Sequence, residues 1–311
     1  MLIISTFSSH KIGMGHFFRS LNLAKQYQKN TILLVNKSNK CKKYLKNIRH
    51  EFVNYKKKNW EKKYIKNKFT IWINDRLNTN SEHVRLLQKN GVFVVSIDDN
   101  GSGGKISNLN FAQNIHLATS KKNNFQKKRK YLILKSVNPQ KIRIRKKIKS
   151  IMVTLGGSDT YNLTNTVIKN LLSLNLKTTV FVGPENKLKK NIIKNKNIIY
   201  KFSVRTLENH MFFYDLIICG GGITPFNAAS QGLPSIIVAN EKHEINTAKY
   251  LVKMGVSTYC GFRSANINTK LISKINLEKM SKNGIYRFDN YGIKNFLDKI
   301  KIEYRKYKKI N

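Results

Sequence analysis

The chain has 311 residues, of which 41% are apolar and only four are proline, so its length fits one large or two ordinary globular domains. It carries 59 Lys and Arg against 16 Asp and Glu, which gives a formal net charge of +43 at pH 7. Compact apolar runs nevertheless recur, as at 31–35 and 151–155, and they exclude a disordered chain.

Targeting and redox features are few. No apolar stretch approaches the ~18–20 residues that cross a bilayer, and the first six residues predict a buried strand rather than a signal peptide, so we expect a cytoplasmic protein. Cys41, Cys219 and Cys260 lie far apart in the chain, which excludes a disulfide framework and a cysteine zinc site.

The large positive charge raises nucleic acid or an anionic membrane as possible partners. Lysines are spread along the whole chain beside many Asn and Ile, a bias that an A+T-rich coding sequence also produces. The dense basic runs at 56–58, 121–130 and 143–149 carry little of the aromatic interleaving used in single-strand binding. We therefore expect no specific nucleic-acid partner and only weak association with a membrane surface.

The first third of the chain alternates short apolar runs with helical patterns, as βα units do. Strands are predicted over 2–6, 31–35, 69–73 and 92–97, a tight glycine loop over 13–16, and helices over 17–27 and 82–88. From 120 to 150 the composition changes to charged residues around one apolar run at 131–134. We place the interdomain connection near 138–149.

The second half restarts the same alternation. Strands are predicted over 151–155, 177–182, 198–200, 216–219 and 235–238, and helices over 162–174, 225–231 and 248–254. A last helical pattern over 291–309 could pack back across the first domain. Two α/β halves, each with a glycine-rich turn after its first strand, predict two Rossmann-like domains that face a central cleft. We expect an N-terminal domain over 1–140, a C-terminal domain over 141–288 and a C-terminal helix over 289–311.

A glycine turn, Gly13-Met14-Gly15-His16, joins the first predicted strand to the first helix. Glycine lets the backbone approach a ligand, and a helix N-terminus offers free N–H groups to an anion. The positive helix end favours a neutral imidazole at His16, which can take a proton from water; the alternative is a histidine that only caps the helix. Arg19, on the same helical face, could orient His16, meet a phosphate or face solvent.

Two further glycine turns follow strands of the second half. In Gly156-Gly157-Ser158-Asp159, either of the last two residues can cap the next helix. Gly220-Gly221-Gly222 precedes Thr224 and Pro225, and proline suits a first helical position. None of the turns completes a dinucleotide fingerprint or a Walker A sequence, and diphosphate binding by helix ends remains open.

The segment 12–24, IGMGHFFRSLNLA, resembles the amino-terminal motif of the pseudaminic-acid pathway UDP-sugar hydrolases, the SpsG-like group. The segment 156–164, GGSDTYNLT, is similar to their second-domain loop. Looser matches follow in the expected order at 97–99, 131–134, 248–255 and 289–292, so the resemblance covers nearly the whole chain.

This resemblance implies a two-domain GT-B architecture, related to the MurG-like glycosyltransferases, with UDP held mainly by the second domain. It implies that water displaces UDP from UDP-2,4-diacetamido-2,4,6-trideoxy-β-L-altrose, with His16 as the base and no metal or other cofactor. The substrate-binding residues that it implies are Gly13, Gly15, Arg19, Asp75, Asp98 and Tyr131. The nucleotide-binding residues are Gly156, Gly157, Ser158, Gly221, Gly222, Thr224, Asn227, His243 and Glu244.

The chain departs from the pattern of the resembled family at two single residues and one pair. Asn227 stands where a carboxylate usually holds the ribose hydroxyls, His243-Glu244 replaces an Asn-Gln or His-Gln pair, and Arg76 replaces a tyrosine. An amide has one acceptor oxygen and no charge, so Asn227 should hold ribose less tightly than a carboxylate. Glu244 could restore the missing acceptor; otherwise it is a solvated loop residue.

Two other functions fit the same sequence. A GT-B glycosyltransferase would use His16 to deprotonate a sugar hydroxyl instead of water, with the same leaving group. A non-catalytic basic protein that binds RNA or anionic surfaces would carry a contiguous basic stripe away from the cleft. Asp98 and Asp99 are adjacent rather than spaced as Asp-x-Asp, so we expect them at a strand end without a metal. We expect a monomer whose partner is a UDP-sugar.

Overall fold

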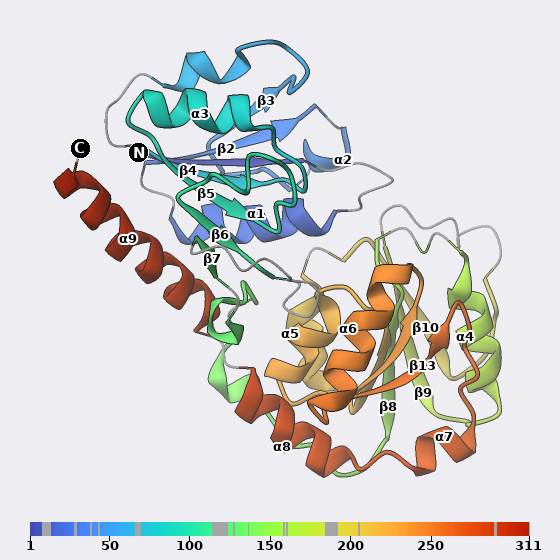
Figure 1. Ribbon diagram of the computed structural model, residues 1–311. Helices are drawn as coiled ribbons and strands as arrows, with labels where there is room; N and C mark the ends of the chain where they lie inside the picture. Colours follow the sequence, from blue (N-terminus) through green and yellow to red (C-terminus); the bar gives the residue numbers. More distant parts are fainter. Residues whose placement is uncertain are drawn as a thin grey trace. The chain divides into compact units, whose positions relative to one another are not determined.

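The computed structural model divides into two compact units (Figure 1). Unit 1 comprises Met1–Ile133 and Tyr291–Asn311, and unit 2 comprises Leu134–Asn290. The structure describes residues 1–7, 14–27, 30–37, 39–42, 44–65, 70–113, 124–126, 128–135, 137–157, 159, 161–183, 192–204, 206–288 and 291–310. The boundary thus lies between 133 and 134, earlier than the expected 140. The reason is that the chain after 134 is already tied to unit 2, since the Lys135 N–H donates to Oδ1 of Asn227 at 3.1 Å.

Unit 1 is built on a parallel sheet with the strand order β3-β2-β1-β4-β5-β6-β7 among the described residues. Its strands are β1 (Leu2–Thr6), β2 (Thr31–Asn36), β3 (His50–Val53), β4 (Ile71–Asp75), β5 (Phe93–Ile97), β6 (Leu109–Phe111) and β7 (Phe125–Gln126). Its helices are α1 (Gly15–Gln26), α2 (Asn39–Lys42), α3 (Ser81–Lys89) and α9 (Gly292–Ile310), with the 3₁₀ turns η1 (Trp60–Tyr64) and η3 (Arg129–Tyr131).

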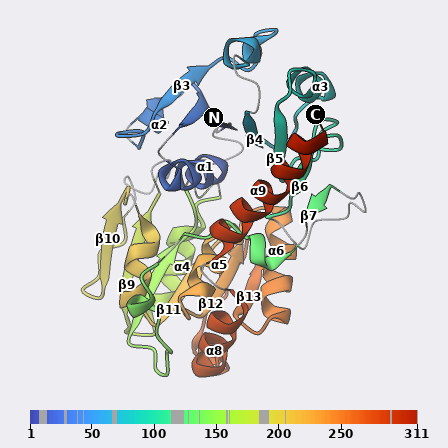
Figure 2. The ribbon, with the colours of Figure 1, turned by 90° about the vertical axis from the view of Figure 1, so that its left-hand side faces the viewer.

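Helices cover both faces of the sheet of unit 1 (Figures 1 and 2). On one face, α1 contributes Phe17 and α9 contributes Phe296 to a core that also contains Phe111. On the other face, Val84 of α3 packs with Trp72 of β4. The apolar residues of α9 recur every three or four positions, so one side of this helix is buried in the core of unit 1.

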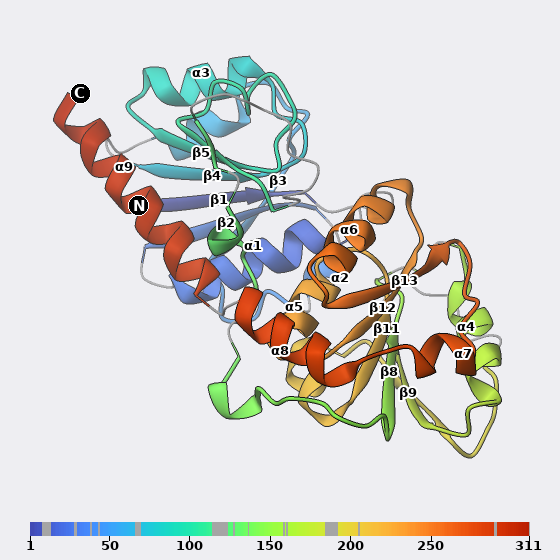
Figure 3. The ribbon, with the colours of Figure 1, turned by 60° about the horizontal axis from the view of Figure 1, so that its bottom comes forward.

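Unit 2 repeats the arrangement with the strand order β10-β9-β8-β11-β12-β13, again all parallel in the described residues. Its strands are β8 (Ser150–Thr154), β9 (Lys177–Val182), β10 (Ile198–Phe202), β11 (Leu216–Cys219), β12 (Ser235–Ala239) and β13 (Ser257–Phe262). Its helices are α4 (Leu163–Leu172), α5 (Thr224–Ser230), α6 (Lys242–Lys253), α7 (Thr269–Ser273) and α8 (Leu277–Arg287), with the 3₁₀ turns η4 (Pro139–Lys141) and η6 (Leu207–Phe213). Within this unit, α4 and α7 lie on one side of the sheet, and α5 and α6 lie on the other (Figure 3).

Each sheet has a point at which the strand order reverses. In unit 1 this point lies between β1 and β4, where Thr6 pairs with Asp75, and in unit 2 it lies between β8 and β11, where Thr154 pairs with Cys219. Chains leave such a point in opposite directions and open a crevice at the carboxyl ends of the strands, where ligands bind in open α/β sheets. Gly15 of the first predicted turn begins the helix that follows β1, and the glycines of the other two turns follow β8 and β11, so these described glycines lie at the two points.

Several elements were not predicted from the sequence: β3, β6, β7, β13 and the helices α2, α7 and α8. The strands β6 and β7 are only three and two residues long, and β13 is only partly buried. None of the three therefore shows a strong alternation of apolar and polar residues in the sequence. α8 carries Gly284 in its interior, which disfavours a helix. A side chain at Gly284 would collide with the carbonyl of Ala229, so tertiary packing accounts for this glycine.

A fully buried arginine, Arg145, joins the start of unit 2 to other segments of the same unit by hydrogen bonds. The guanidinium of Arg145 donates to the backbone carbonyls of Arg143 at 2.8 Å, Met211 at 3.1 Å and Tyr214 at 3.2 Å, and also to that of Gln231. Burial, reinforced by the charge of Arg143, lowers the pKa of Arg145 to about 9. Four carbonyls that approach from different segments therefore depend on one cation.

We expect Arg145→Met to lower the free energy of unfolding by about 3 kcal/mol, because the buried carbonyls lose their donor. Urea denaturation of the full chain measures this change. Arg287→Met in α8 is the control, since it removes another arginine from unit 2 and changes the net charge by the same amount. Equal midpoints for Arg145→Met and the parent would contradict the role assigned to Arg145.

Candidate active site

His16 and Asp75 meet at the carboxyl edge of the sheet of unit 1. His16 is the second residue of α1 and Asp75 the last residue of β4, and Nδ1 of His16 lies 2.6 Å from Oδ1 of Asp75. A carboxylate only accepts hydrogen bonds, whereas Nη2 of Arg19, which lies 3.1 Å from the same Nδ1, only donates; we assign the proton to Nδ1 because the contact with Asp75 is the shorter, and Nε2 then keeps its lone pair. No described residue forms a hydrogen bond with Nε2, and the side chain of His16 is 14% exposed. The pair therefore resembles the arrangement of an oriented general base.

Arg19 and Ser20 complete the surroundings of Asp75. Arg19 donates from Nε to Oδ2 of Asp75 at 2.9 Å and from Nη2 to Oδ1 at 2.5 Å. Its Nη1 donates to Oδ2 of Asp98 at 2.8 Å. The hydroxyl of Ser20 donates to Oδ2 of Asp75 at 2.9 Å. Arg19 also lies beside His16, with Nη2 3.1 Å from Nδ1, which fits the alternative in which Arg19 orients His16.

The charges in this cluster hold one another in their ionised forms. Burial would raise the pKa of Asp75, but the guanidinium of Arg19 and the neighbouring imidazole hold that pKa well below its usual range. Burial would lower the pKa of Arg19, but the carboxylates of Asp75 and Asp98 raise it above its usual value. Asp75 is fully buried, and both of its carboxylate oxygens accept hydrogen bonds. It therefore holds His16 and Arg19 in place, which corrects the expectation that it touches a substrate.

Asp98 is held in an unusual backbone conformation. Its φ of 52° lies in the left-handed region, which non-glycine residues rarely adopt. Its N–H donates to the carbonyl of Phe111 at 2.9 Å, and its Oδ1 accepts from the N–H of Gln113 at 2.7 Å. Strained residues persist where the surroundings fix them, often at functional sites. Asp99 is different, because it accepts from the N–H groups of Thr79 and Gly101 and so has the structural role expected at a strand end.

Some predicted residues of unit 1 lie elsewhere. Tyr131 was expected to bind substrate, but its side chain is buried in the core, where its ring packs edge-on against Phe111. Gly15 is the first residue of α1, and Gly13 lies outside the described residues. Arg76 stands where the resemblance implies a tyrosine, and its guanidinium stacks over the ring of Tyr55 with its centre 4.3 Å from the ring centroid.

The first glycine turn of unit 2 is closed by a helix cap. Oδ1 and Oδ2 of Asp159 accept from the N–H groups of Leu163 at 2.9 Å and Thr164 at 3.0 Å, which confirms Asp159 as a cap of α4. Gly156 has a φ of 86°, where glycine is unstrained. Gly156 is exposed and Gly157 is half-buried, so this turn is open to solvent in the described unit, whereas Ser158 lies outside the described residues.

The second glycine turn of unit 2 packs against the start of α6. A side chain at Gly221 would lie 2.6 Å from Cβ of Glu244, so only glycine fits there. We expected Glu244 to lie in a loop, but it lies in α6, because this helix begins at Lys242 rather than at residue 248. Its Oε2 accepts from the N–H of Asn240 at 2.7 Å and from that of Glu241 at 3.4 Å. Glu244 therefore fixes the beginning of a helix, which accounts for this residue without a nucleotide.

The other predicted nucleotide-binding residues differ in accessibility. Asn227 is buried in α5, and its Nδ2 donates to Oε1 of Glu208 at 3.3 Å while its Oδ1 accepts from Lys135. Its amide is thus occupied within unit 2, which corrects the expectation that it holds a ribose. Gly222 and His243 are exposed, and Thr224 is the first residue of α5. Pro225 follows in the first turn of that helix, as predicted.

Sequence reasoning missed the polar residues that support the site: Ser20, Gln113 and Asn240. Ser20 occupies an ordinary helix position, and the amide of Asn240 donates to the carbonyl of Leu155 from 85 residues away. Gln113 uses its backbone N–H, which every residue except proline has. None of the three has a spacing that could have marked it. Asp75 did have a signal, because it ends an apolar strand beside the first strand.

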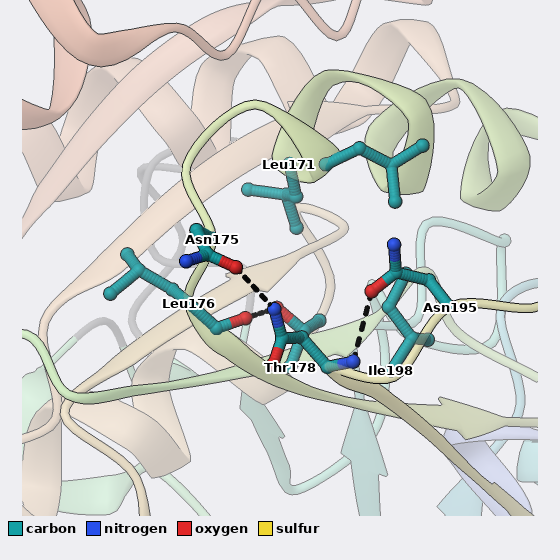
Figure 4. Close-up of a pocket in the computed structure, with 8 residues that line it drawn as sticks. Leu171, Asn175, Leu176, Thr178, Asn195 and Ile198 are labelled. Atoms are coloured by element: carbon teal, nitrogen blue, oxygen red, sulfur yellow. Dashed lines mark hydrogen bonds between the residues drawn. The ribbon is translucent and has the colours of Figure 1, made fainter.

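A small cavity in unit 2 lies away from the glycine turns (Figure 4). It lies near the amino ends of β9 and β10, with Leu171, Thr178 and Ile198 in its lining. Its volume of about 10 Å³ is about the space of one water molecule. It cannot hold a nucleotide, and its amide groups bond to one another, as between Asn197 Nδ2 and Asn175 Oδ1 at 2.6 Å.

Neither a metal-binding cluster nor a membrane span is found in the part of the chain that the structure describes. No group of three or more His, Cys, Asp or Glu side chains is placed to hold a metal ion in the described parts of either unit. None of the helices that the structure describes is both long and apolar enough to cross a membrane.

A buried histidine in unit 1 gives stability a pH dependence. Burial lowers the pKa of His83, although Glu61, whose Oε1 lies 3.3 Å from Nδ1, partly opposes this. A base with a lowered pKa in the folded state binds its proton more readily when unfolded, so protonation favours unfolding. In the unfolded chain the pKa of a histidine is about 6.5, and the pKa of an aspartate such as Asp75 is about 3.9.

We therefore expect the free energy of unfolding to be nearly constant between about pH 7 and 8, to fall below about pH 6.5 as His83 is protonated, and to fall again below about pH 4 as carboxylates with lowered pKa values, Asp75 among them, are protonated. Urea titrations between pH 3 and 8 measure this profile. His83→Gln should reduce the first decline and keep the second, because His210, whose pKa is also lowered by burial, contributes the rest of the first decline. A flat parent profile between pH 7 and 5 would contradict the assignment to His83.

The comparisons with known proteins agree on the second half of the chain and on the fold. The family model of the glycosyltransferase family 28 C-terminal domain matches residues 150–306, about half of the chain. An uncharacterized protein of Methanocaldococcus jannaschii is 28% identical over 274 residues, which cover 76% of this chain and 55% of the relative. The chain thus spans about half the length of that curated relative.

Solved structures extend the likeness to both units. MurG of Acinetobacter baumannii matches with a TM-score of 0.63 and 14% identity, over 96% of this chain and 98% of that one. The glycotransferase of kitacinnamycin matches with a TM-score of 0.66 and 10% identity, over 97% of this chain and 98% of that one. The spinosyn rhamnosyltransferase SpnG, solved with thymidine diphosphate, matches with a TM-score of 0.61 and 10% identity, over 96% of this chain and 100% of that one. The chain therefore has the GT-B fold and belongs to the family defined by the glycosyltransferase family 28 C-terminal domain.

Proposed function

We propose that this protein hydrolyses a nucleotide sugar, and that its substrate is UDP-2,4-diacetamido-2,4,6-trideoxy-β-L-altrose or a related UDP-sugar. The observation that supports the proposal best is the pair of His16 and Asp75 at the switch point of unit 1, with Nδ1 and Oδ1 2.6 Å apart. A histidine oriented in this way has Nε2 available for a proton. The resemblance of 12–24 to the UDP-sugar hydrolases supports water as the group that loses this proton.

The reaction would proceed by one displacement. Nε2 of His16 takes a proton from water, and the water oxygen forms a bond to the anomeric carbon of the sugar. The bond between that carbon and the diphosphate oxygen breaks, and its electron pair leaves with UDP. Asp75 stabilises the resulting imidazolium by its charge and keeps the ring in place, as carboxylates do in other histidine bases.

Unit 2 would hold the departing diphosphate. The turns after β8 and β11 precede the N-termini of α4 and α5, and helix N-termini carry free N–H groups and partial positive charge. Asp159 already occupies two N–H groups of α4, so we assign the diphosphate mainly to the turn over 220–222 and the start of α5. These groups provide charge stabilisation without a metal, so activity should survive chelation by EDTA.

Glycosyl transfer is the second candidate, and the family supports it. The matching structures include glycosyltransferases, one of them solved with thymidine diphosphate and also with the spinosyn aglycone. In that reaction His16 would take the proton from an acceptor hydroxyl, and the diphosphate would leave in the same way. The nucleotide could then be a diphosphate other than UDP.

Incubation with UDP-, TDP-, CMP- and GDP-sugars, with and without sugar acceptors, distinguishes the two candidates. Chromatography of the released nucleotide is the measurement. Release of UDP without an acceptor supports hydrolysis, and release that requires an acceptor supports transfer. No release from any donor in the panel, with the chain folded, would contradict both.

A further inference from the structure

Three charged side chains form a line that ends at the candidate base, His16. Starting from His16, the contacts run to Asp75 at 2.6 Å, from Asp75 to Arg19 at 2.9 and 2.5 Å, and from Arg19 to Asp98 at 2.8 Å. The side chains are 14%, 0%, 11% and 7% exposed in the same order. Water therefore screens these charges weakly, and each one acts on the next.

Asp75 alone would make a poor partner for a base that must work at neutral pH. A buried carboxylate 2.6 Å from the ring attracts the positive charge of an imidazolium, and this attraction favours the form that has already accepted its proton. Arg19 opposes this effect in two ways. It neutralises Asp75 through two hydrogen bonds, and its Nη2 places a positive charge 3.1 Å from Nδ1.

Asp98 acts on Arg19 in the opposite sense. It takes one of the guanidinium nitrogens and neutralises part of its charge, while the N–H of Gln113 fixes the carboxylate. Among the described residues, the charged groups that face His16 are Arg19 from its own helix and Asp75 from β4, and Asp98 after β5 acts through Arg19. The signs alternate along the line.

We propose that Arg19 and Asp98 are positioning residues that set, in opposite directions, the pH range in which His16 can act as a base. Arg19 favours the neutral imidazole and Asp98 weakens Arg19. The inference rests on the role of His16 in the proposed function, but the charge effect itself belongs to the folded protein and exists without substrate.

The test uses the full chain with Arg19→Gln and Asp98→Asn, and Arg85→Gln as the control. Arg85 is exposed on α3, so its variant changes the net charge by the same amount as Arg19→Gln without contact with the site. The first measurement is the NMR titration of the His16 ring, assigned by comparison with His16→Gln. The second is the acid limb of the pH profile of nucleotide release.

Arg19→Gln should move the midpoint of the His16 titration to higher pH by roughly one pH unit, and Asp98→Asn should move it to lower pH. Arg85→Gln should leave it in place. The acid limb of nucleotide release should move in the same directions. Arg19→Lys, which keeps the charge, should move the midpoint less than Arg19→Gln.

The two measurements separate the inference from the proposed function. Opposite shifts in the NMR titration support the charge line even where no donor in the panel is consumed, a result that would count against the proposed function alone. Shifts of both variants in one direction, or no shift in variants with parental near-UV circular dichroism, would overturn the charge line. If Arg19→Gln does not fold, a midpoint of Asp98→Asn equal to that of the parent would overturn it as well.

Discussion

Replacement of His16 by alanine should lower nucleotide release by roughly 10²–10⁴-fold, the usual contribution of a positioned acid or base. Nε2 is the group available to accept a proton, since Nδ1 is bound to Asp75. The fold should persist, because His16 lies at the start of α1 with part of its side chain exposed and Asp75 keeps Arg19 and Ser20 as partners. Initial rates at saturating donor measure the effect.

His50→Ala is the control for this variant. His50 belongs to β3 of the same unit, and its ring packs edge-on against Phe52. It should retain parental nucleotide release. Near-parental turnover in His16→Ala, with the control behaving as expected, would remove His16 from the mechanism, and the base would then have to be sought among other residues.

Asp75→Ala should damage both stability and activity. Among the described residues, the change leaves the guanidinium of Arg19 with Asp98 as its one carboxylate partner, and it leaves the hydroxyl of Ser20 without its acceptor. The free energy of unfolding should therefore fall by roughly 3–5 kcal/mol. It also removes the group that orients His16. Activity should fall by about 10²-fold or more, as for the loss of a positioned base. Urea denaturation and the nucleotide assay measure the two losses.

Asp75→Asn separates the two effects, because it keeps the volume and removes the charge. It should unfold at a higher urea concentration than Asp75→Ala, yet lose activity to a similar extent, since an amide can hold Nδ1 in the wrong tautomer. Recovery of activity in Asp75→Asn along with stability would indicate that Asp75 serves the fold alone and does not prepare His16.

The central elements of both units follow directly from the sequence. β1, β9 and β11 lie at their predicted bounds, and α1 and α4 differ from the prediction by one or two residues at each end. These elements carry strong local signals, because strands buried on both faces are continuous apolar runs and helices on a sheet repeat their apolar residues at helical spacing. Glycine turns at strand ends are also local, and so was the cap at Asp159.

Only part of the candidate site can be predicted from residues that are close together in the sequence. His16 and Arg19 share one turn of α1 and could be paired from their spacing, and Asp75 could be placed at a strand end. That these three meet depends on β4 lying beside β1, a neighbour relation set by sheet topology across nearly 70 residues. Asp98, 79 residues from Arg19, joins them only because β5 follows β4 in the same sheet.

Short-range patterns of apolar residues and glycine encode the two α/β halves, their central strands and the glycine turns that end them, so these features can be predicted without a structure. The roles of the polar side chains depend on contacts between distant parts of the chain. Asn227 and Glu244 looked like ligand-binding residues in the sequence, yet their polar atoms bond to Lys135, Glu208 and Asn240. A polar side chain takes whichever partner the fold brings within about 3 Å, and chain spacing does not contain that information.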